Sequence, residues 1–344
     1  FRNNFLSAIF NLGNVYFLVR QFEKSISYYL QALKCDNHHV DSYSNIGTCY
    51  KELGDLKKAR YFYIKALKLN PKHVNTLNNL SVIMLDNGEF VEALPLLKAV
   101  VKIDSSNPIY LFNLANLYKE KGDFSESIKY LQRAVNLNHN FNKAQAELIH
   151  LKGRLCVWDD HFKDLKIASK IGIEGDYPLV HLGMFALHDD PALDLERAKK
   201  FYNNFFNFNN NFLTSKENKL IRLGYISANF YDHPVTQLLI RTLELHDTNK
   251  FELYLYSLDS VQQDAYTCRI KNVNANFFQI DSLSDYEVIK LIRSHNLDLA
   301  IDLMGYTKGN KFTMFANRIS PIQISYLGFP GTTGSACIDY LIAD

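Results

Sequence analysis

The sequence of 344 residues lacks the segments that mark several large classes of protein. It has no run of about 18 apolar residues, so it predicts no transmembrane helix. Its formal net charge of +2 gives no electrostatic reason to expect a nucleic acid or a membrane surface as a partner. Its five cysteines form no CxxC pair and have no metal-ligand spacing with histidine, which is typical of scattered thiols in a reducing, cytoplasmic compartment.

Three short motifs of ligand binding are also missing. The absence of GxGxxG disfavours a nicotinamide dehydrogenase, and the absence of GxxxxGK followed by Ser or Thr gives no support to phosphate-loop chemistry. No Asp-x-Asp pair occurs, and Asp190-Pro191 is better explained as the start of a helix than as a metal ligand. The sequence starts without Met in a segment that is already periodic like a helix, so we expect it to begin inside a larger protein.

A repeat of 34 residues fills the first 140 positions. Small residues recur in the second half of each copy, where they let the paired helices approach closely. The pattern predicts a superhelix of paired α-helices over residues 1–141. One triplet recurs without insertion as Asn11-Leu12-Gly13, Asn45-Ile46-Gly47, Asn79-Leu80-Ser81 and Asn113-Leu114-Ala115.

The asparagine of this triplet, Asn11, Asn45, Asn79 and Asn113, occupies the first helix of each pair. Stacking of the repeats would line the four amides along one face. An amide both donates and accepts hydrogen bonds, so such a row can hold an extended peptide backbone. Solvated amides, or amides that cap neighbouring turns, would give the same pattern, so the residues alone leave both interpretations open.

The second half of the chain changes character twice. Residues 142–217 remain helical in pattern but lose the repeat phase, and we interpret them as a helical linker region. From residue 218 to 344, short apolar runs alternate with amphipathic stretches, which predicts a parallel, doubly wound sheet. The expected strands are Leu220–Ser227, Phe251–Ser257, Phe277–Ile280, Leu297–Leu303 and Ile322–Leu327, and the expected helices are Val235–Leu245, Ala265–Asn272, Tyr286–Ser294 and Lys311–Arg318.

Three loops of this predicted sheet follow the carboxyl ends of strands, where ligands of such sheets bind. They span residues 228–234 with His233, residues 305–309 with Thr307, and residues 328–334 with three glycines. Each loop alone is better explained as a turn, because Gly, Pro and Asp are turn residues. Since all three fall on one edge, and His233 precedes a predicted helix, together they favour a shared site.

These segments resemble the signature blocks of the protein O-linked N-acetylglucosamine transferases of the SPINDLY type. The resemblance implies an α-α superhelix of tetratricopeptide repeats followed by one Rossmann-like half of a GT-B glycosyltransferase. It also implies that the other half, with the main donor contacts, lies beyond Asp344, so we expect the fragment alone to be inactive. The resemblance of the second half of the chain rests on GYISANFYDHPV, DLMGYTKGN, FANRISPIQISYLGFPGTTG and DYLIAD. The resemblance to tetratricopeptide repeats rests, in the best copy, on Ile46-Gly47, Tyr50, Ala59, Tyr63, Ala66 and Pro71.

The resemblance implies inverting transfer of N-acetylglucosamine from UDP-GlcNAc to Ser and Thr hydroxyls of proteins, without a metal or other cofactor. Acceptor proteins would bind along the concave face of the repeats, because Asn11, Asn45, Asn79 and Asn113 match the asparagine ladder of the family. Two alternatives stay open: a non-catalytic repeat scaffold that binds protein partners, and a protein O-fucosyltransferase that uses GDP-fucose.

The same resemblance assigns the site residues. His233 matches a histidine proposed as a base or an acceptor-positioning group, and a histidine at a helix N-terminus is favoured in the neutral form that can accept a proton. Five residues match family positions that line the sugar pocket: Thr307, Gly305 and, through their backbone, Leu327, Gly328 and Pro330. The sequence departs from the family at Gln237, where histidine is usual, and at Tyr326, where tryptophan is usual, which leaves acceptor and sugar preference open.

Overall fold

The computed structural model describes residues 2–343 apart from 175–177, 181–182, 184–186, 188–189, 207–212, 214–217 and 261. The chain divides into two compact units, Phe1–His161 and Phe162–Asp344. Among the described residues, none of the helices combines the length and the apolar character that crossing a bilayer requires.

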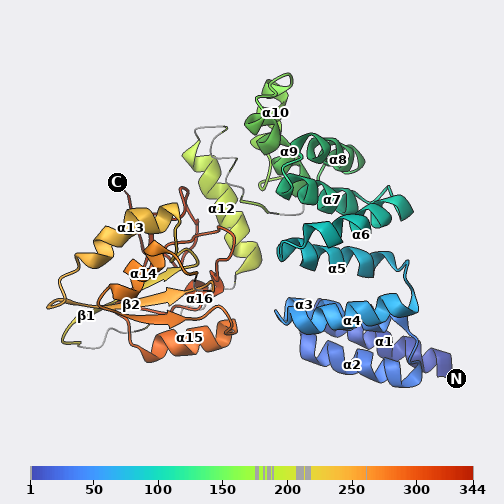
Figure 1. The fold of residues 1–344 in the computed structure, drawn as a ribbon, viewed down its shortest axis with the longest axis horizontal. Helices are drawn as coiled ribbons and strands as arrows, with labels where there is room; N and C mark the ends of the chain where they lie inside the picture. Colours follow the sequence, from blue (N-terminus) through green and yellow to red (C-terminus); the bar gives the residue numbers. More distant parts are fainter. Residues whose placement is uncertain are drawn as a thin grey trace. The chain divides into compact units, whose positions relative to one another are not determined.

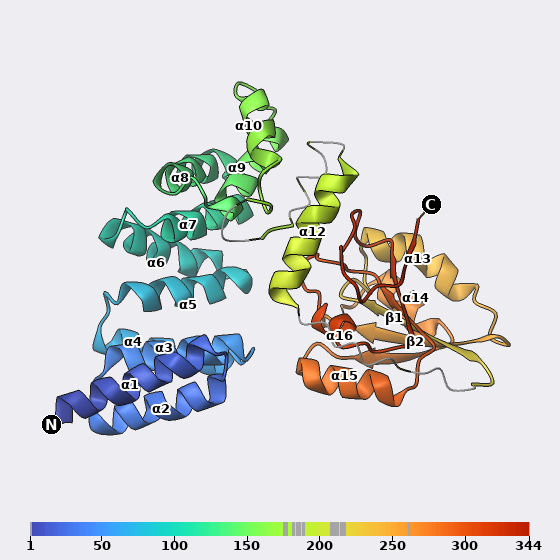
Figure 2. The same cartoon turned by 180° about the vertical axis from the view of Figure 1, so that it is seen from behind.

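The first unit is a stack of antiparallel helix pairs, which confirms the predicted helical repeats (Figures 1 and 2). In three of the pairs, the turn between the two helices contains a glycine with a positive φ near 80°, namely Gly54, Gly88 and Gly122. In the first pair Arg20 takes that left-handed conformation instead, with φ of 58°. The helices are α1 (Arg2–Leu18), α2 (Phe22–Cys35), α3 (Val40–Glu52), α4 (Leu56–Leu69), α5 (Val74–Asp86), α6 (Phe90–Ile103), α7 (Pro108–Glu120), α8 (Phe124–Leu137) and α9 (Asn142–Arg154).

A glycine and a tyrosine fill the space between the two helices of the first two pairs. A Cβ atom on Gly13 would lie 2.5 Å from the Tyr29 ring, and one on Gly47 would lie 2.6 Å from the Tyr63 ring. In the next two copies the same positions hold Ser81 with Leu97 and Ala115 with Leu131, all buried. A larger residue on one helix is therefore accompanied by a smaller one on the other, as close packing requires.

The second unit contains a six-stranded parallel sheet in the order β3-β2-β1-β4-β5-β6, which confirms the predicted architecture. β2 and β3 are added in turn on one side of β1, and β4, β5 and β6 are then added on the other side of β1. The direction of strand addition therefore reverses between β1 and β4. That reversal is where ligands of doubly wound sheets bind. The strands are β1 (Ile221–Ser227), β2 (Phe251–Ser257), β3 (Ala275–Gln279), β4 (Leu299–Asp302), β5 (Ile322–Tyr326) and β6 (Tyr340–Ile342).

Alternate residues of each strand pack against helices on opposite faces of the sheet. On one face Leu253 and Leu255 join Leu239 and Leu243 of α13. On the other face the cluster contains Tyr256, together with residues of α15, α16 and α12. The helices of this unit are α10 (His161–Ala168), α12 (Pro191–Phe205), α13 (Pro234–Glu244), α14 (Ala265–Asn272), α15 (Asp285–Ser294) and α16 (Thr313–Ala316), with α10 starting at the last residue of the first unit.

Two elements differ from the expected pattern. The helix expected over Lys311–Arg318 is only the four residues of α16, and Arg318 has a left-handed φ of 57° that stops it. The strand β6 was not expected, and its three residues are exposed at the edge of the sheet.

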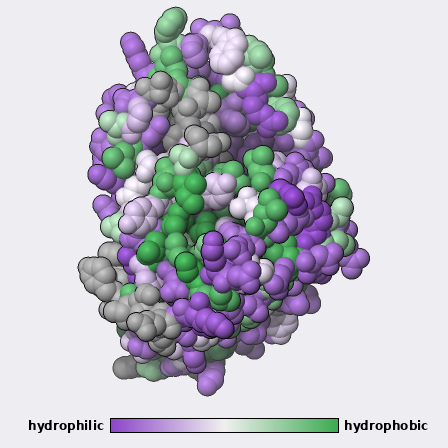
Figure 3. Space-filling model, turned by 90° about the vertical axis from the view of Figure 1, so that its left-hand side faces the viewer, coloured by the Kyte–Doolittle hydropathy of each residue, from purple (hydrophilic) through white to green (hydrophobic). Residues whose placement is uncertain are grey.

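Figure 3 shows one face of the molecule, where hydrophobic residues gather near the centre and hydrophilic residues surround them.

Candidate functional site

Four strand ends line one cavity of about 490 Å³ at the carboxyl edge of the sheet. It brings together three of the residues predicted from the sequence, namely His233 after β1, Thr307 after β4 and Gly328 after β5. Gly305, Leu327 and Pro330 are not among the residues that line it. The structure thus collects the three predicted loops around one hollow, next to the point where the strand order reverses.

The loop after β2 also contributes to this cavity, through Leu258 and Asp259. The sequence analysis did not single out these residues, although the rule that selected the other loops applies to the end of β2 as well. Asp259 is the single carboxylate among the described lining residues, whose other titratable side chains are Tyr231, His233 and Lys308.

His233 is the N-cap of α13, with Pro234 in the first turn. Its Nδ1 accepts a hydrogen bond of 3.2 Å from the backbone N–H of Val235. While this bond is made, the neutral ring carries its proton on Nε2. The ring therefore presents a donor from its other nitrogen, and acceptance of a hydroxyl proton there requires that the Val235 bond is given up first.

Tyr231 lies beside this histidine, with the two rings edge to face and their centroids 5.7 Å apart. Burial raises the pKa of the Tyr231 hydroxyl, and the negative charge of Asp259 raises it further. The phenol is therefore protonated at neutral pH. The cavity thus holds two neighbouring groups, one on Tyr231 and one on His233, that can donate hydrogen bonds to an oxygen-rich ligand.

The loops after β1 and β4 are joined through Met304. Its sulfur accepts from the backbone N–H of Ala228 at 3.2 Å, and its carbonyl accepts from the hydroxyl of Thr307 at 2.7 Å. Asp302, 2% exposed, accepts from the backbone N–H groups of Met304 and Gly305 at 2.9 and 3.0 Å. Burial raises the pKa of Asp302 to about 6 although both bonds favour the carboxylate. Asp302 therefore fixes the turn that carries Thr307.

The loop after β5 approaches the end of β4 so closely that only glycine fits. A Cβ atom on Gly328 would lie 1.6 Å from the carbonyl oxygen of Leu303. The preceding Leu327 has a φ of 66°, and the N–H of Gly328 donates to the carbonyl of Tyr326 at 2.8 Å, which closes a three-residue turn. A leucine in this conformation is strained, and such strain is concentrated at functional sites.

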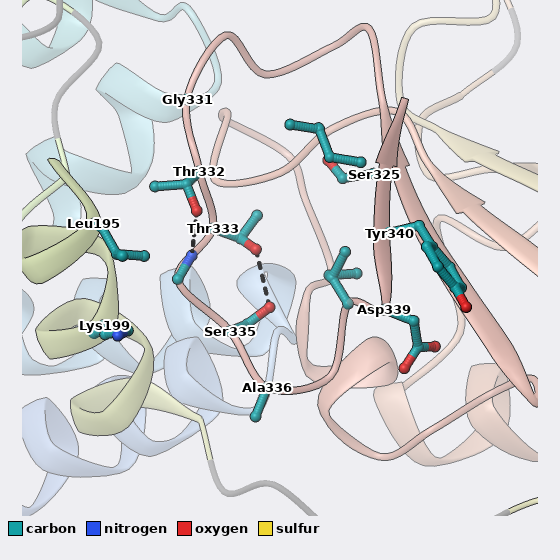
Figure 4. Close-up of a pocket in the computed structure, with 13 residues that line it drawn as sticks. Leu195, Lys199, Ser325, Gly331, Thr332, Thr333, Ser335, Ala336, Asp339 and Tyr340 are labelled. Atoms are coloured by element: carbon teal, nitrogen blue, oxygen red, sulfur yellow. Dashed lines mark hydrogen bonds between the residues drawn. The ribbon is translucent and has the colours of Figure 1, made fainter. Parts of the chain in front are cut away.

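The rest of the glycine-rich loop faces a second hollow of about 450 Å³, which Leu195 and Lys199 of α12 close on one side (Figure 4). Gly334 has a φ of 59°, and a Cβ atom there would lie 2.5 Å from the backbone nitrogen of Lys199. The Tyr306 hydroxyl donates to the carbonyl of Thr333 at 2.6 Å. The loop is thus divided, with Gly328 at the first cavity and residues 331–335 packed against α12.

Gln237 and Tyr326, the two departures from the family pattern, both lie outside the cavity lining. The amide of Gln237 donates to Asp232 at 2.8 Å on the exposed side of α13. Tyr326 is half-buried against the hydrophobic cluster beneath α13. Among the described residues, no group of three or more His, Cys, Asp or Glu side chains could hold a metal ion, and the absence of a metal stays a prediction.

The four asparagines of the repeats lie on α1, α3, α5 and α7, and Asn11 is exposed while the other three are half-buried. Each of the last three donates its amide to a side chain of the preceding repeat. The partners are Asn14 Oδ1 for Asn45 at 3.2 Å, Thr48 Oγ1 for Asn79 at 3.4 Å, and Asn78 Oδ1 for Asn113 at 2.8 Å. These amides therefore connect neighbouring repeats, which neither of the two sequence interpretations included.

Comparison with known proteins supports both parts of the chain. Residues 175–344 match the family described as glycosyl transferase family 41. Residues 6–39, 40–73 and 84–150 match tetratricopeptide repeats.

The chain aligns with several curated relatives. It is 36% identical over 126 residues to the "Probable UDP-N-acetylglucosamine--peptide N-acetylglucosaminyltransferase SEC" of Arabidopsis thaliana, covering 37% of this chain and 13% of the relative. It is 30% identical over 165 residues to the enzyme of the same description called SPINDLY from Petunia hybrida, covering 47% and 17%. The matched region thus spans a small fraction of the length of these relatives.

A solved structure shares the fold. A mutant of the Thermobaculum terrenum O-GlcNAc transferase superimposes with a TM-score of 0.53 over 89% of this chain and 53% of that chain, at 22% sequence identity. The matched families and this shared fold agree with the resemblance found in the sequence. The chain therefore carries tetratricopeptide repeats followed by a domain of glycosyltransferase family 41.

Proposed function

We propose that this chain is part of a protein O-glycosyltransferase that transfers N-acetylglucosamine from UDP-GlcNAc to Ser and Thr hydroxyls, with inversion at the sugar. The observation that carries the proposal is the cavity where His233, Thr307 and Gly328 meet at the carboxyl edge of a family 41 sheet. The names of the relatives, which are described as probable UDP-N-acetylglucosamine--peptide N-acetylglucosaminyltransferases, support both the donor and the class of acceptor.

The cavity supports a division of roles. The backbone at Gly328 forms part of the cavity wall, where a sugar can contact it directly. Tyr231 and His233 donate hydrogen bonds to ligand oxygens, and Met304 holds Thr307 in the loop after β4. The bond from Val235 to Nδ1 supports His233 as a donor that positions a reacting oxygen. In this role it lowers the barrier by orientation rather than by removing a proton.

Proteins are the proposed acceptors, held along the concave face of the repeats by Asn11, Asn45, Asn79 and Asn113. We propose that no metal or other cofactor takes part, and that neither a nucleic acid nor a membrane is a partner. A cytoplasmic location is proposed as well, and the five cysteines, all of them free, support a reducing compartment.

The test is an assay of the product of the full reading frame that contains this chain. Acceptor peptides are incubated with UDP-GlcNAc, GDP-fucose or other nucleotide sugars in separate reactions, and the mass added to each peptide is measured. We expect addition of N-acetylhexosamine from UDP-GlcNAc. Addition of fucose alone would replace the proposed donor, and peptide binding without transfer from any donor would favour the scaffold.

A second assay separates a protein acceptor from a small one. Replacement of Asn45, Asn79 and Asn113 together by Ala is expected to lower turnover of protein acceptors strongly, because the amides proposed to hold the acceptor backbone are lost. Hydrolysis of UDP-GlcNAc by the same variant serves as the control and is expected to be unchanged. Unchanged protein turnover would contradict binding along the repeats.

A further inference from the structure

A second set of polar side chains lies behind the asparagines and repeats with the same spacing of 34 residues. Tyr29 of α2 and Tyr63 of α4 are 1% and 0% exposed, yet each hydroxyl reaches the first helix of its own pair. The Tyr29 hydroxyl donates to Asn14 Oδ1 at 2.7 Å, and the Tyr63 hydroxyl donates to Thr48 Oγ1 at 3.1 Å. Asn14 and Thr48 are equivalent positions of successive repeats.

The ladder asparagine of the next repeat bonds to the same oxygen. Asn45 Nδ2 lies 3.2 Å from Asn14 Oδ1 and 3.3 Å from the Tyr29 hydroxyl oxygen. Asn79 Nδ2 lies 3.4 Å from Thr48 Oγ1. We call each set of three side chains an amide triad. The first triad is Tyr29, Asn14 and Asn45, and the second is Tyr63, Thr48 and Asn79.

The hydrogens of the second triad can be counted. The Thr48 hydroxyl donates its single proton to the carbonyl of Ser44 at 3.1 Å, so its oxygen can only accept from Tyr63 and Asn79. Asn79 must therefore turn its NH₂ group, not its carbonyl, toward Thr48. The first triad has the same order of donors, with Asn14 Oδ1 in the place of the threonine oxygen.

This orientation leaves the carbonyl oxygens of the two asparagines with capacity to accept. In the described part of the chain, Asn45 Oδ1 receives no hydrogen bond. Asn79 Oδ1 receives one long bond of 3.4 Å, from Asn78 Nδ2, and a carbonyl oxygen has two lone pairs. Both asparagines are half-buried, so their oxygens are not sealed from a ligand.

The third junction provides an internal comparison. Leu97 occupies the position of the two tyrosines, and Val82 that of Asn14 and Thr48. No triad forms there, and Asn113 donates instead to Asn78 Oδ1 at 2.8 Å. The orientation of Asn113 is therefore independent of a tyrosine hydroxyl.

We infer that Tyr29 and Tyr63 are positioning residues that hold Asn45 and Asn79 with their carbonyl oxygens available, so that these two positions recognise backbone N–H groups of an extended acceptor peptide. The inference deepens the proposed function and rests on it. It assigns a direction to recognition, because these repeats supply acceptors and the peptide supplies donors.

The first experiment changes the peptide. A fluorescein-labelled 15-residue peptide of Ala, Ser, Thr and Val is compared with a version in which alternate peptide bonds are esters, which removes N–H groups with little change of shape. Binding to the 344-residue chain is measured by fluorescence anisotropy. We expect the ester peptide to bind about tenfold more weakly, since the N–H groups that Asn45 and Asn79 would bind are lost.

Equal affinity for both peptides would overturn the inference while leaving the proposed function intact. The inference and the proposed function would both be refuted if neither peptide bound to the chain and the full-length protein transferred no sugar to the unmodified peptide.

The second experiment is a double-mutant cycle on the second triad. We expect Tyr63→Phe to weaken peptide binding about threefold to tenfold in the wild-type background and to have no further effect in an Asn79→Ala background. Tyr130→Phe, on α8 and outside the triads, is the control and is expected to bind normally. The side-chain amide resonances of Asn79 should shift in Tyr63→Phe and stay unchanged in Tyr130→Phe. Additive effects of Tyr63→Phe and Asn79→Ala would overturn the role given to the tyrosine.

Discussion

The two units of this chain arrange their candidate binding groups in opposite ways. In the repeat unit the groups are spread, one asparagine for each repeat, and each of the last three is bonded to its neighbour. In the sheet unit four strand ends converge on one cavity, and one of the walls is bare backbone at Gly328. A spread site gains strength by repetition and tolerates the loss of one member. A converged site depends on each of its parts.

The largest effect is expected for Gly328→Ala. The added Cβ atom would lie 1.6 Å from the Leu303 carbonyl oxygen, so β4 and β5 would have to move apart. We expect a loss of more than about 4 kcal/mol in the free energy of unfolding of the sheet unit, measured by urea unfolding and limited proteolysis. Gly54→Ala is the control in the repeats, because φ there is 81° but nothing lies within 4 Å, and it should cost about 1 kcal/mol. Similar losses in the two variants would contradict the difference between the units.

The next effect concerns His233 in the full-length protein. His233→Ala is expected to lower turnover about 100-fold with little change in UDP-GlcNAc binding, because the donor that positions the reacting oxygen is lost. His233→Asn keeps an oxygen that can accept from the Val235 N–H, so it should retain wild-type stability but show a similar loss of turnover. Parallel losses of donor binding and turnover would count against a role in the chemical step.

A smaller effect is expected in the repeats, from Gly47→Ala. Its Cβ atom would meet the Tyr63 ring at 2.6 Å, and such overpacking costs about 2 kcal/mol. Adding Tyr63→Leu should recover about half of the loss, since Ser81 with Leu97 and Ala115 with Leu131 already combine a larger and a smaller residue in this way. Thermal unfolding of the single and double variants measures both values. A double variant less stable than Gly47→Ala alone would show that the two positions do not compensate.

The smallest effect is the pH dependence that Asp302 contributes. Its pKa of about 6 in the folded chain lies above the value of about 3.9 expected in the unfolded chain, so the folded state binds the proton more tightly. The associated stability is full below about pH 4 and is lost as the pH rises through about 6. Between pH 5 and 7.5 the wild type should lose about 1.4 kcal/mol relative to Asp302→Asn. Parallel stability curves for the two proteins would refute this assignment.

Much of the fold follows from local pattern. The expected bounds of β2 and α14 are those observed, and β1 differs by one residue. β1 and β2 are each a short apolar run that ends in five consecutive buried residues, and α14 begins at a clear N-cap, Asp264. β6 could not be expected, because its residues are few and exposed. Its place depends on distant partners instead, since Asp339 pairs with Arg318 at 2.8 Å and accepts from the N–H of Gln323.

The site was predictable in part for the same reason. The carboxyl-edge rule found the three loops that carry His233, Thr307 and Gly328, and the family resemblance singled out these residues within them. Asp259 required the same rule to be applied to the end of β2. The left-handed φ of Leu327 could not be expected, because leucine rarely adopts it outside a forced turn. The tautomer of His233 depends on one backbone N–H two residues away, which no spacing encodes.

The matched residue sizes inside each helix pair have a consequence for building new arrays. Gly47 tolerates Tyr63 because both belong to one repeat, and Ser81 accompanies Leu97 for the same reason. A chimera joined in the turn between the helices of one repeat would place Ser81 opposite a tyrosine, or Gly47 opposite a leucine, and leave either a clash or a void. Chimeras joined between repeats keep each pair together, so the whole helix pair is the smallest module that can be exchanged.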